Sequence, residues 1–321
     1  MERLLINTCT SQPDKFKNYT KLIAGVIGIS FSPLAVKLVV FSASVSAFYR
    51  SFDAACFFLL VAGVRQVFWR DTNSRQTSPG WIKPSILAGI FLGIDLIFWH
   101  KTIFYLGMGP ATFLGNSQIL FVTIFAIVVL KEHVPKVFFL ILIMVIVGLY
   151  LLTPLNTTGV SRPAGYGLGL IVGVTYAGML ICLRYAKKLA GGSYPELLSL
   201  AVMFLSSSAV ILFSVYIIEG LTIAVWNFKS HVIMALTALL CQTIGWYLIN
   251  SSILELPAHE GSLILMLQPL LATVWGCLLF LEPLSAVQII GIVLSLTGIV
   301  WYQMIKKEDC IQKQSETEKV L

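Results

Sequence analysis

Charged residues are scarce in this sequence. Asp, Glu, Lys and Arg make up 12% of its 321 residues, whereas 57% are hydrophobic. Soluble domains carry about 25% charged residues, and the mean hydropathy here is +0.88. The composition therefore excludes a soluble protein and predicts an integral membrane protein. The formal net charge of +7 then reflects membrane topology, so we expect no nucleic-acid partner.

Other absences narrow the function further. The six cysteines show no paired spacing, so we expect neither a disulfide nor a metal site. No HExxH, GxSxG or Walker A motif occurs, and no GxGxxG follows a predicted strand. We therefore predict a protein that is not an enzyme, has no catalytic residues, uses no cofactor and is not itself driven by ATP. The polar start of the chain also predicts no cleaved signal peptide.

Long apolar runs fill most of the chain. A helix needs roughly 20 mostly apolar residues to cross a bilayer, and Pro, Gly or charged residues separate ten such runs. The predicted segments are 22–42, 45–68, 82–105, 110–130, 135–153, 164–185, 195–218, 231–254, 257–281 and 284–304. The expected fold class is thus an all-α integral membrane protein with ten transmembrane helices, preceded by a segment at 1–20 and followed by a tail at 305–321.

Two stretches of the chain are near copies of each other. Trp99 and Trp246 are 147 residues apart, and after a three-residue insertion the offset becomes 150, which aligns Glu132 with Glu282. A constant offset of this kind indicates an internal duplication. Because each copy holds five spans, the second copy is expected to lie upside down relative to the first. This predicts two inverted repeats, at 21–154 and 163–304, an arrangement typical of alternating-access carriers.

Basic residues predict the orientation. With the N-terminus in the cytoplasm, seventeen Lys and Arg residues fall on the inner side, and only Arg162 and Lys229 fall on the outer side. Cytoplasmic loops of membrane proteins carry an excess of Lys and Arg. Both termini are therefore predicted to be cytoplasmic.

Asp95 lies near the middle of the third segment. A carboxylate within hydrocarbon costs at least roughly 2.5 kcal/mol, so it needs a partner or a wet cavity. Its repeat mate is Gln242, and a tryptophan follows each by four residues, which places Trp99 and Trp246 on the same helix faces. These four residues predict a binding pocket at the midplane of the membrane. The alternative is a helix–helix hydrogen bond, with the tryptophans packing or anchoring at an interface.

Asn116, Gln118 and Gln268 form a second polar set in the fourth and ninth segments. Amides can bind a solute carboxylate or amide, but they also join helices. Tyr176, in the sixth segment, completes the set of candidate substrate-binding residues. Arg50 and Asp53 are three residues apart on the second segment, and we interpret them as a structural ion pair.

Several runs resemble the drug/metabolite transporter superfamily, in its EamA branch. They are FYRSFDAACFFLL, FAIVVLKEHVPKVFFLILIMVIVGLYLL and CLLFLEPLSAVQIIGIVLSLTGIVWY. The second copy carries the spacing typical of this branch at Pro257, Pro269, Glu282 and Leu284, whereas Ile119 stands where the first copy would have proline. The resemblance implies a secondary carrier with a central cavity lined by helices of both halves.

The function expected from these features is secondary active transport of a small metabolite across a bacterial inner membrane. One intramembrane carboxylate among tryptophans favours an amino acid or related compound. An S-adenosylmethionine or nucleotide-like solute is the alternative, and a non-transporting scaffold or receptor is an alternative of another class. The expected partners are the solute and the lipid bilayer, and we also consider a coupling proton or ion, an exchanged solute and a homodimer.

Overall fold

The computed structural model describes residues 12–68, 78–106, 108–152, 163–191, 194–218, 220, 226–280 and 284–320. All regular structure in these residues is helical. The first half contains α1 (Gln12–Ser30), α2 (Ser32–Leu38), α3 (Ala43–Phe68), the 3-10 helix η3 (Pro79–Trp81), α4 (Ile82–Leu106), α5 (Met108–Gly115), α6 (Gln118–Val128) and α7 (Lys136–Leu152).

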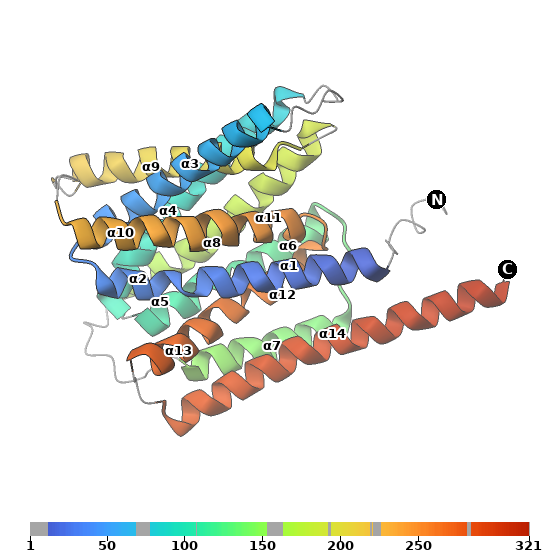
Figure 1. The fold of residues 1–321 in the computed structure, drawn as a ribbon. Helices are drawn as coiled ribbons and strands as arrows, with labels where there is room; N and C mark the ends of the chain where they lie inside the picture. Colours follow the sequence, from blue (N-terminus) through green and yellow to red (C-terminus); the bar gives the residue numbers. More distant parts are fainter. Residues whose placement is uncertain are drawn as a thin grey trace.

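The second half contains two π-helical stretches. Its elements are α8 (Pro163–Ala190), α9 (Glu196–Phe213), η4 (Ser214–Ile218), α10 (Phe228–Thr237), η5 (Ala238–Gly245), α11 (Trp246–Ile253), α12 (Ala258–Leu265), α13 (Leu267–Phe280) and α14 (Ala286–Val320). Both η4 and η5 are π-helices. We call the right-hand end of the bundle in Figure 1, where α1 begins and α14 ends, the terminal end.

The helices occupy the positions of the ten predicted segments, but ten is not confirmed as a count of spans. In the described residues, eight helical stretches are long and apolar enough to cross a membrane. Helix α7 is apolar but shorter, at 17 residues. The first predicted segment corresponds to α1 and α2, which are interrupted at Phe31. The protein is therefore a multi-pass membrane protein whose described part is all-α.

The first helix begins earlier than the sequence predicts. Hydropathy places its start near residue 22, whereas α1 begins at Gln12. Residues 12–21 are too polar to register as a span, but a helix that projects beyond hydrocarbon needs no apolar side chains there. Likewise α14 continues through the predicted tail to Val320.

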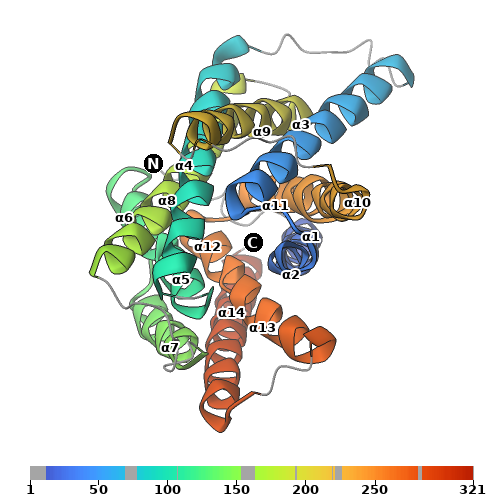
Figure 2. The same ribbon diagram turned by 90° about the vertical axis from the view of Figure 1, so that its left-hand side faces the viewer.

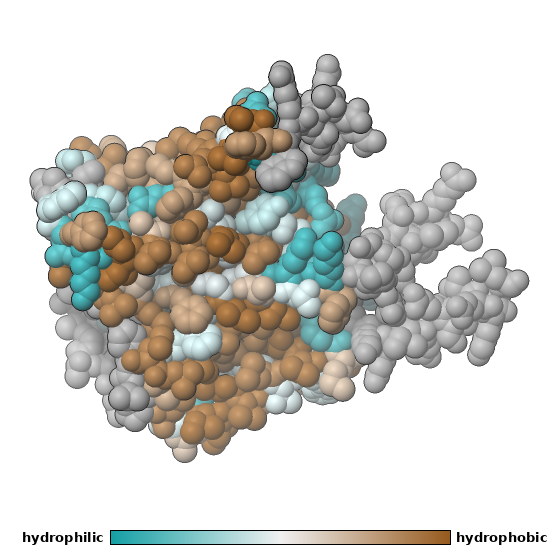
Figure 3. Space-filling view, viewed as in Figure 1, coloured by the Kyte–Doolittle hydropathy of each residue, from teal (hydrophilic) through white to brown (hydrophobic). Residues whose placement is uncertain are grey.

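The outer surface of the bundle is apolar. Large hydrophobic side chains such as Val128, Phe213 and Leu278 are more than 60% exposed, and Figure 3 shows hydrophobic residues over most of the face between the two ends. Such a surface would aggregate in water but matches lipid.

Helix packing places a central region between two groups of helices. Viewed along the bundle in Figure 2, α3, α4 and α9 lie on one side, and α7 and α14 lie together on the other. The larger apolar core includes Phe58, Phe204 and Trp246, and a second core lies around Phe138 and Ile141 on α7. The candidate site described next lies between these groups.

Candidate functional site

A cavity of about 150 Å³ lies inside the bundle and is lined by helices of both halves. Seven of the eight residues that the sequence proposes for substrate binding line it: Asp95, Trp99, Asn116, Tyr176, Gln242, Trp246 and Gln268. The eighth, Gln118, is fully buried outside this cavity. The structure thus brings together residues from five predicted segments, two in the first half and three in the second, while their role in binding stays a prediction.

Asp95 retains hydrogen-bonding capacity toward the cavity. Its Oδ1 lies 3.4 Å from the Oγ1 of Thr175 on α8. That hydroxyl has a single hydrogen, and the carbonyls of Ile171 and Val172 lie closer, at 2.9 and 3.0 Å. The bond to Asp95 is therefore long and shared, so its carboxylate can accept hydrogen bonds from a cationic group in the cavity.

Arg50 is a cavity residue that the sequence interpretation missed. It is 8% exposed, lines the cavity, and donates from Nη1 to the Oγ of Ser32 at 2.8 Å. No ion pair joins it to Asp53 among the described residues, so the predicted pairing of these two residues is wrong. The available signal was the position of Arg50 near the start of its segment. The sequence interpretation instead paired Arg50 with Asp53, because the two residues are three positions apart.

Ser32 connects three helices at this point. Its Oγ also accepts a hydrogen bond from Nε2 of Gln242 at 3.3 Å. Gln242 lies in the π-helical stretch η5, and π-helical turns occur often at functional sites because they change the direction of a side chain. Ser32 begins α2, directly after the interruption at Phe31. The polar wall of the cavity is therefore built where two helices depart from regular α geometry.

The interruption between α1 and α2 is itself held in place. Pro33 has no N–H, so it cannot bond the carbonyl of Ile29, which lines the cavity. The Phe31 ring stacks on Trp275 at 4.5 Å between centroids, and Trp275 Nε1 donates to the Oγ of Ser30 at 2.8 Å. Irregular backbone at membrane depth is tolerated where it lines a cavity.

Aromatic rings form the apolar walls. Tyr176 and Trp246 meet edge to face at 6.3 Å between centroids, and Trp99 also lines the cavity. Nε2 of Gln268 lies 3.4 Å from the Tyr176 hydroxyl, which gives Tyr176 a polar partner from α13. Asn116 bonds back to Thr112 through Nδ2 at 2.8 Å. The cavity thus offers a carboxylate, a guanidinium, amides and flat apolar faces.

Metal chemistry has no obvious site in the described part of the chain. No group of three or more His, Cys, Asp or Glu side chains there is arranged to hold a metal ion.

The comparisons with known proteins fit this architecture. A solved structure described only as "Crystal structure of protein" aligns with a TM-score of 0.73 over 91% of this chain and 98% of that chain, at 15% sequence identity. At that identity the alignment shows a shared fold alone. No curated protein matches the sequence. Residues 163–303 match the model of the EamA-like transporter family, which lies within the drug/metabolite transporter superfamily. Over these residues the chain is similar to EamA-like transporters, and this similarity supports membrane transport of small solutes as its function.

Proposed function

We propose that this protein is a secondary active transporter that moves a small zwitterionic metabolite, an amino acid or a related compound, by alternating access. The observation that carries the proposal is the pair of opposite charges in one cavity: both Asp95 and Arg50 line it. A carboxylate suits the ammonium of such a solute, and a guanidinium suits its carboxylate. The rings of Trp99, Tyr176 and Trp246 would pack against its apolar part.

The cavity volume favours a compact solute. Pockets for drug-sized ligands measure roughly 300 to 1,000 Å³, and this cavity measures about 150 Å³. A void of about 150 Å³ can hold a benzene-sized molecule. The volume therefore favours an amino acid over an S-adenosylmethionine or nucleotide-like solute.

A second observation supports the predicted inverted repeats at 21–154 and 163–304. The fourth predicted segment is interrupted at Asn116, between α5 and α6, and the ninth at Met266, between α12 and α13. These positions are 150 residues apart, the offset found in the sequence. Interrupted helices at corresponding positions of two halves are typical binding elements of inverted-repeat transporters.

The cavity also bears on the non-transporting alternative. A scaffold or receptor predicts polar groups that pair within the bundle and a closed, dry core, but Asp95 and Gln268 both line a cavity. We further propose a bacterial inner membrane location with the terminal end in the cytoplasm. A coupling proton or ion, an exchanged solute and a homodimer stay predictions.

Three forms of one solute test the proposal. They are an amino acid with an uncharged side chain, its methyl ester and its N-acetyl derivative. The ester lacks the free carboxylate, and the N-acetyl derivative lacks the ammonium. We expect the parent to stabilise the purified protein thermally and to exchange in proteoliposomes. Each derivative should bind about tenfold or more weakly, because a charge-assisted hydrogen bond contributes roughly 1.5–3 kcal/mol.

Matched variants test which cavity residue binds the ammonium of the solute and which binds its carboxylate. Asp95→Asn should remove the penalty for the acetylated form, and Arg50→Gln should remove the penalty for the ester. Asp53→Asn serves as the control, because Asp53 lies on the same helix as Arg50 but does not line the cavity. Equal binding of all three forms by the unmodified protein would refute a zwitterion site. Binding of nucleosides in place of amino acids would support the alternative solute.

A further inference from the structure

A partly buried polar cluster joins the connection after α6 to the start of α12. The Glu132 carboxylate, in the connection after α6, accepts hydrogen bonds from the backbone N–H of Ala258 at 3.0 Å and lies 3.1 Å from Nδ1 of His259. Ala258 and His259 form the first turn of α12. A carboxylate at a helix N-terminus meets exposed N–H groups and the positive end of the helix dipole. Glu132 is thus the link between the first half and the start of α12.

The cluster extends to two more helices. Nε2 of His259 lies 3.2 Å from the hydroxyl of Tyr302 on α14, and the Tyr19 hydroxyl on α1 donates to Oε2 of Glu260 at 2.5 Å. His259, Glu260 and Tyr302 are at most 3% exposed. We call Tyr19, Glu132, His259, Glu260 and Tyr302 the clasp.

Unpaired polar atoms lie on α6 and α12, two helices that pack against each other. Both amide atoms of Gln118, Oγ1 of Thr123 and Oγ of Ser262 are buried with no hydrogen-bond partner. Buried polar groups are normally satisfied, and leaving them unsatisfied costs free energy. Water that reached these atoms in another conformation would satisfy them.

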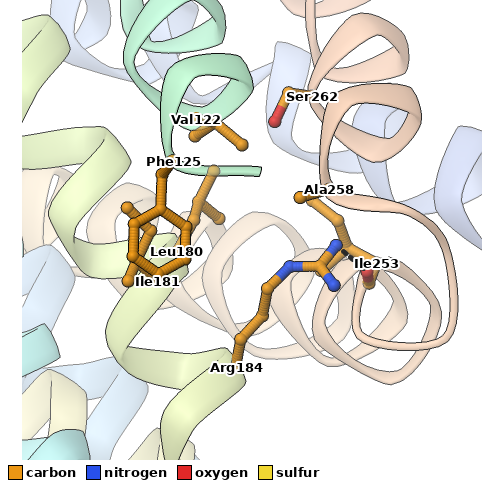
Figure 4. A pocket seen from close by; sticks show the side chains of 8 residues that line it. All are labelled: Val122, Phe125, Leu180, Ile181, Arg184, Ile253, Ala258 and Ser262. Atoms are coloured by element: carbon orange, nitrogen blue, oxygen red, sulfur yellow. Dashed lines mark hydrogen bonds between the residues drawn. The ribbon is translucent and has the colours of Figure 1, made fainter. Parts of the chain in front are cut away.

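Figure 4 shows a small void at this contact, bordered by Val122 of α6, Ser262 of α12 and the Arg184 side chain. Its volume is about 10 Å³, close to the minimum that holds one water. Arg184 donates from Nη2 to the carbonyls of Ile253 and Leu256, both at 2.8 Å, and thereby fixes the turn that precedes α12. The contact is therefore closed to solutes in this conformation but not filled.

The opposite end of the bundle differs. Under the 150-residue offset, α6 corresponds to α13 and α12 corresponds to α5. Helices α6 and α12 pack together, whereas the described parts of α5 and α13 show no comparable packing. The two equivalent contacts are therefore in different states, one closed and one apart.

We infer that the contact between α6 and α12 is the inner half of the solute path, and that the clasp is its gate. The inference rests on the proposed alternating access. When the clasp separates, α12 moves away from α6, and water or solute reaches Gln118, Thr123 and Ser262. Gln118, which the sequence places among the binding residues, then contacts the solute on its way in or out rather than in the cavity.

Thiol labelling of vesicles tests the gate without any solute. Ser262→Cys is introduced in a background whose native cysteines are replaced, and a membrane-impermeant maleimide is added to inside-out or right-side-out vesicles. With Glu132 intact, the Ser262→Cys variant should react slowly with the maleimide from both sides. Adding Glu132→Ala should raise the rate about tenfold or more from the cytoplasmic side alone, since it removes two hydrogen bonds to a charged acceptor.

Glu255→Gln is the matched control. Glu255 is a carboxylate near the same turn, but it is half exposed and pairs with Lys187 outside the clasp. Glu132→Gln keeps the side-chain volume and one acceptor oxygen, so it should give an intermediate rate even if Glu132→Ala folds poorly.

Two outcomes separate this inference from the proposed function. An unchanged labelling rate in both Glu132 variants, or a faster reaction from the outer side, would overturn the gate, and solute exchange measured in the same vesicles would still stand. Faster inner labelling without exchange of any tested amino acid would support the gate and reject the solute.

Discussion

Ser32 shows how much of the cavity depends on one small side chain. Its hydroxyl oxygen accepts hydrogen bonds from both Arg50 and Gln242, so it holds a positive group from α3 and an amide from η5 at the start of α2. An arginine buried in a membrane protein normally needs a partner or water. Since that partner is a neutral hydroxyl, the guanidinium keeps donors for a solute.

Glu132 gives a pH prediction at the same scale. Burial raises its pKa, but the hydrogen bonds from His259 and Ala258 and the charge of Arg184 outweigh burial, so its pKa lies below the ordinary value of 4.5. The closed clasp therefore favours the ionised carboxylate. The contribution of this carboxylate to the stability of the closed clasp is fully present above its ordinary pKa. It is lost as the pH falls through the lowered pKa.

The groups facing Glu132 are Arg184 on α8 and His259 on α12, with Glu260 and Tyr302 beyond the imidazole. We expect labelling of Ser262→Cys from the inner side to stay slow from about pH 8 to pH 5, and to rise only as the pH falls below 4.5. A rise near neutral pH would show that another group controls the clasp.

The sequence proposed seven of the residues that the structure gathers around the cavity. Four of them came from the repeat offset, which aligns Asp95 with Gln242 and Trp99 with Trp246. Arg50 was not predictable by this route. Its hydrogen-bond partner Ser32 lies on another helix, and a nearby acid at Asp53 offered a simpler pairing.

At the scale of elements, α7 and α14 approach each other closely at Gly148. A Cβ added to Gly148 would lie 2.2 Å from Oγ of Ser295 and 2.7 Å from the carbonyl oxygen of Gly291. Because a backbone oxygen cannot rotate away, Gly148→Ala should force the helices apart and destabilise the protein by about 1–3 kcal/mol.

Thermal unfolding of the purified protein in detergent measures this effect. Gly63→Ala on α3 is the control, since nothing lies within 4 Å of the added atom. A melting temperature for Gly148→Ala equal to that of Gly63→Ala would show that α7 and α14 adjust without cost.

The sequence predicted where the helices lie better than where they break. Hydropathy averages over roughly 20 residues, so it locates spans but does not register the interruption at Phe31 or the π-helical stretch that carries Gln242. These irregularities depend on contacts with distant residues, such as the stacking of Phe31 on Trp275.

Topology is the prediction that belongs to the whole molecule. Lys131 follows α6 toward the terminal end, and Lys229 lies in the first turn of α10 at the opposite end. If the terminal end is cytoplasmic, Lys229→Cys in intact cells should react with an impermeant maleimide, whereas Lys131→Cys should react only after permeabilisation. The reverse pattern would invert the proposed orientation, and reaction at both sites would refute the five-span repeat.

Helix α14 is 35 residues long. At about 1.5 Å per residue it measures about 52 Å, well beyond the roughly 30 Å of hydrocarbon in a bilayer. Its apolar span ends at Ile305, just after the clasp residue Tyr302. The part of α14 after Ile305 continues the same helix beyond the apolar span. A fluorophore attached near Val320 could therefore report tilting of α14 during transport from a point remote from the translocation route.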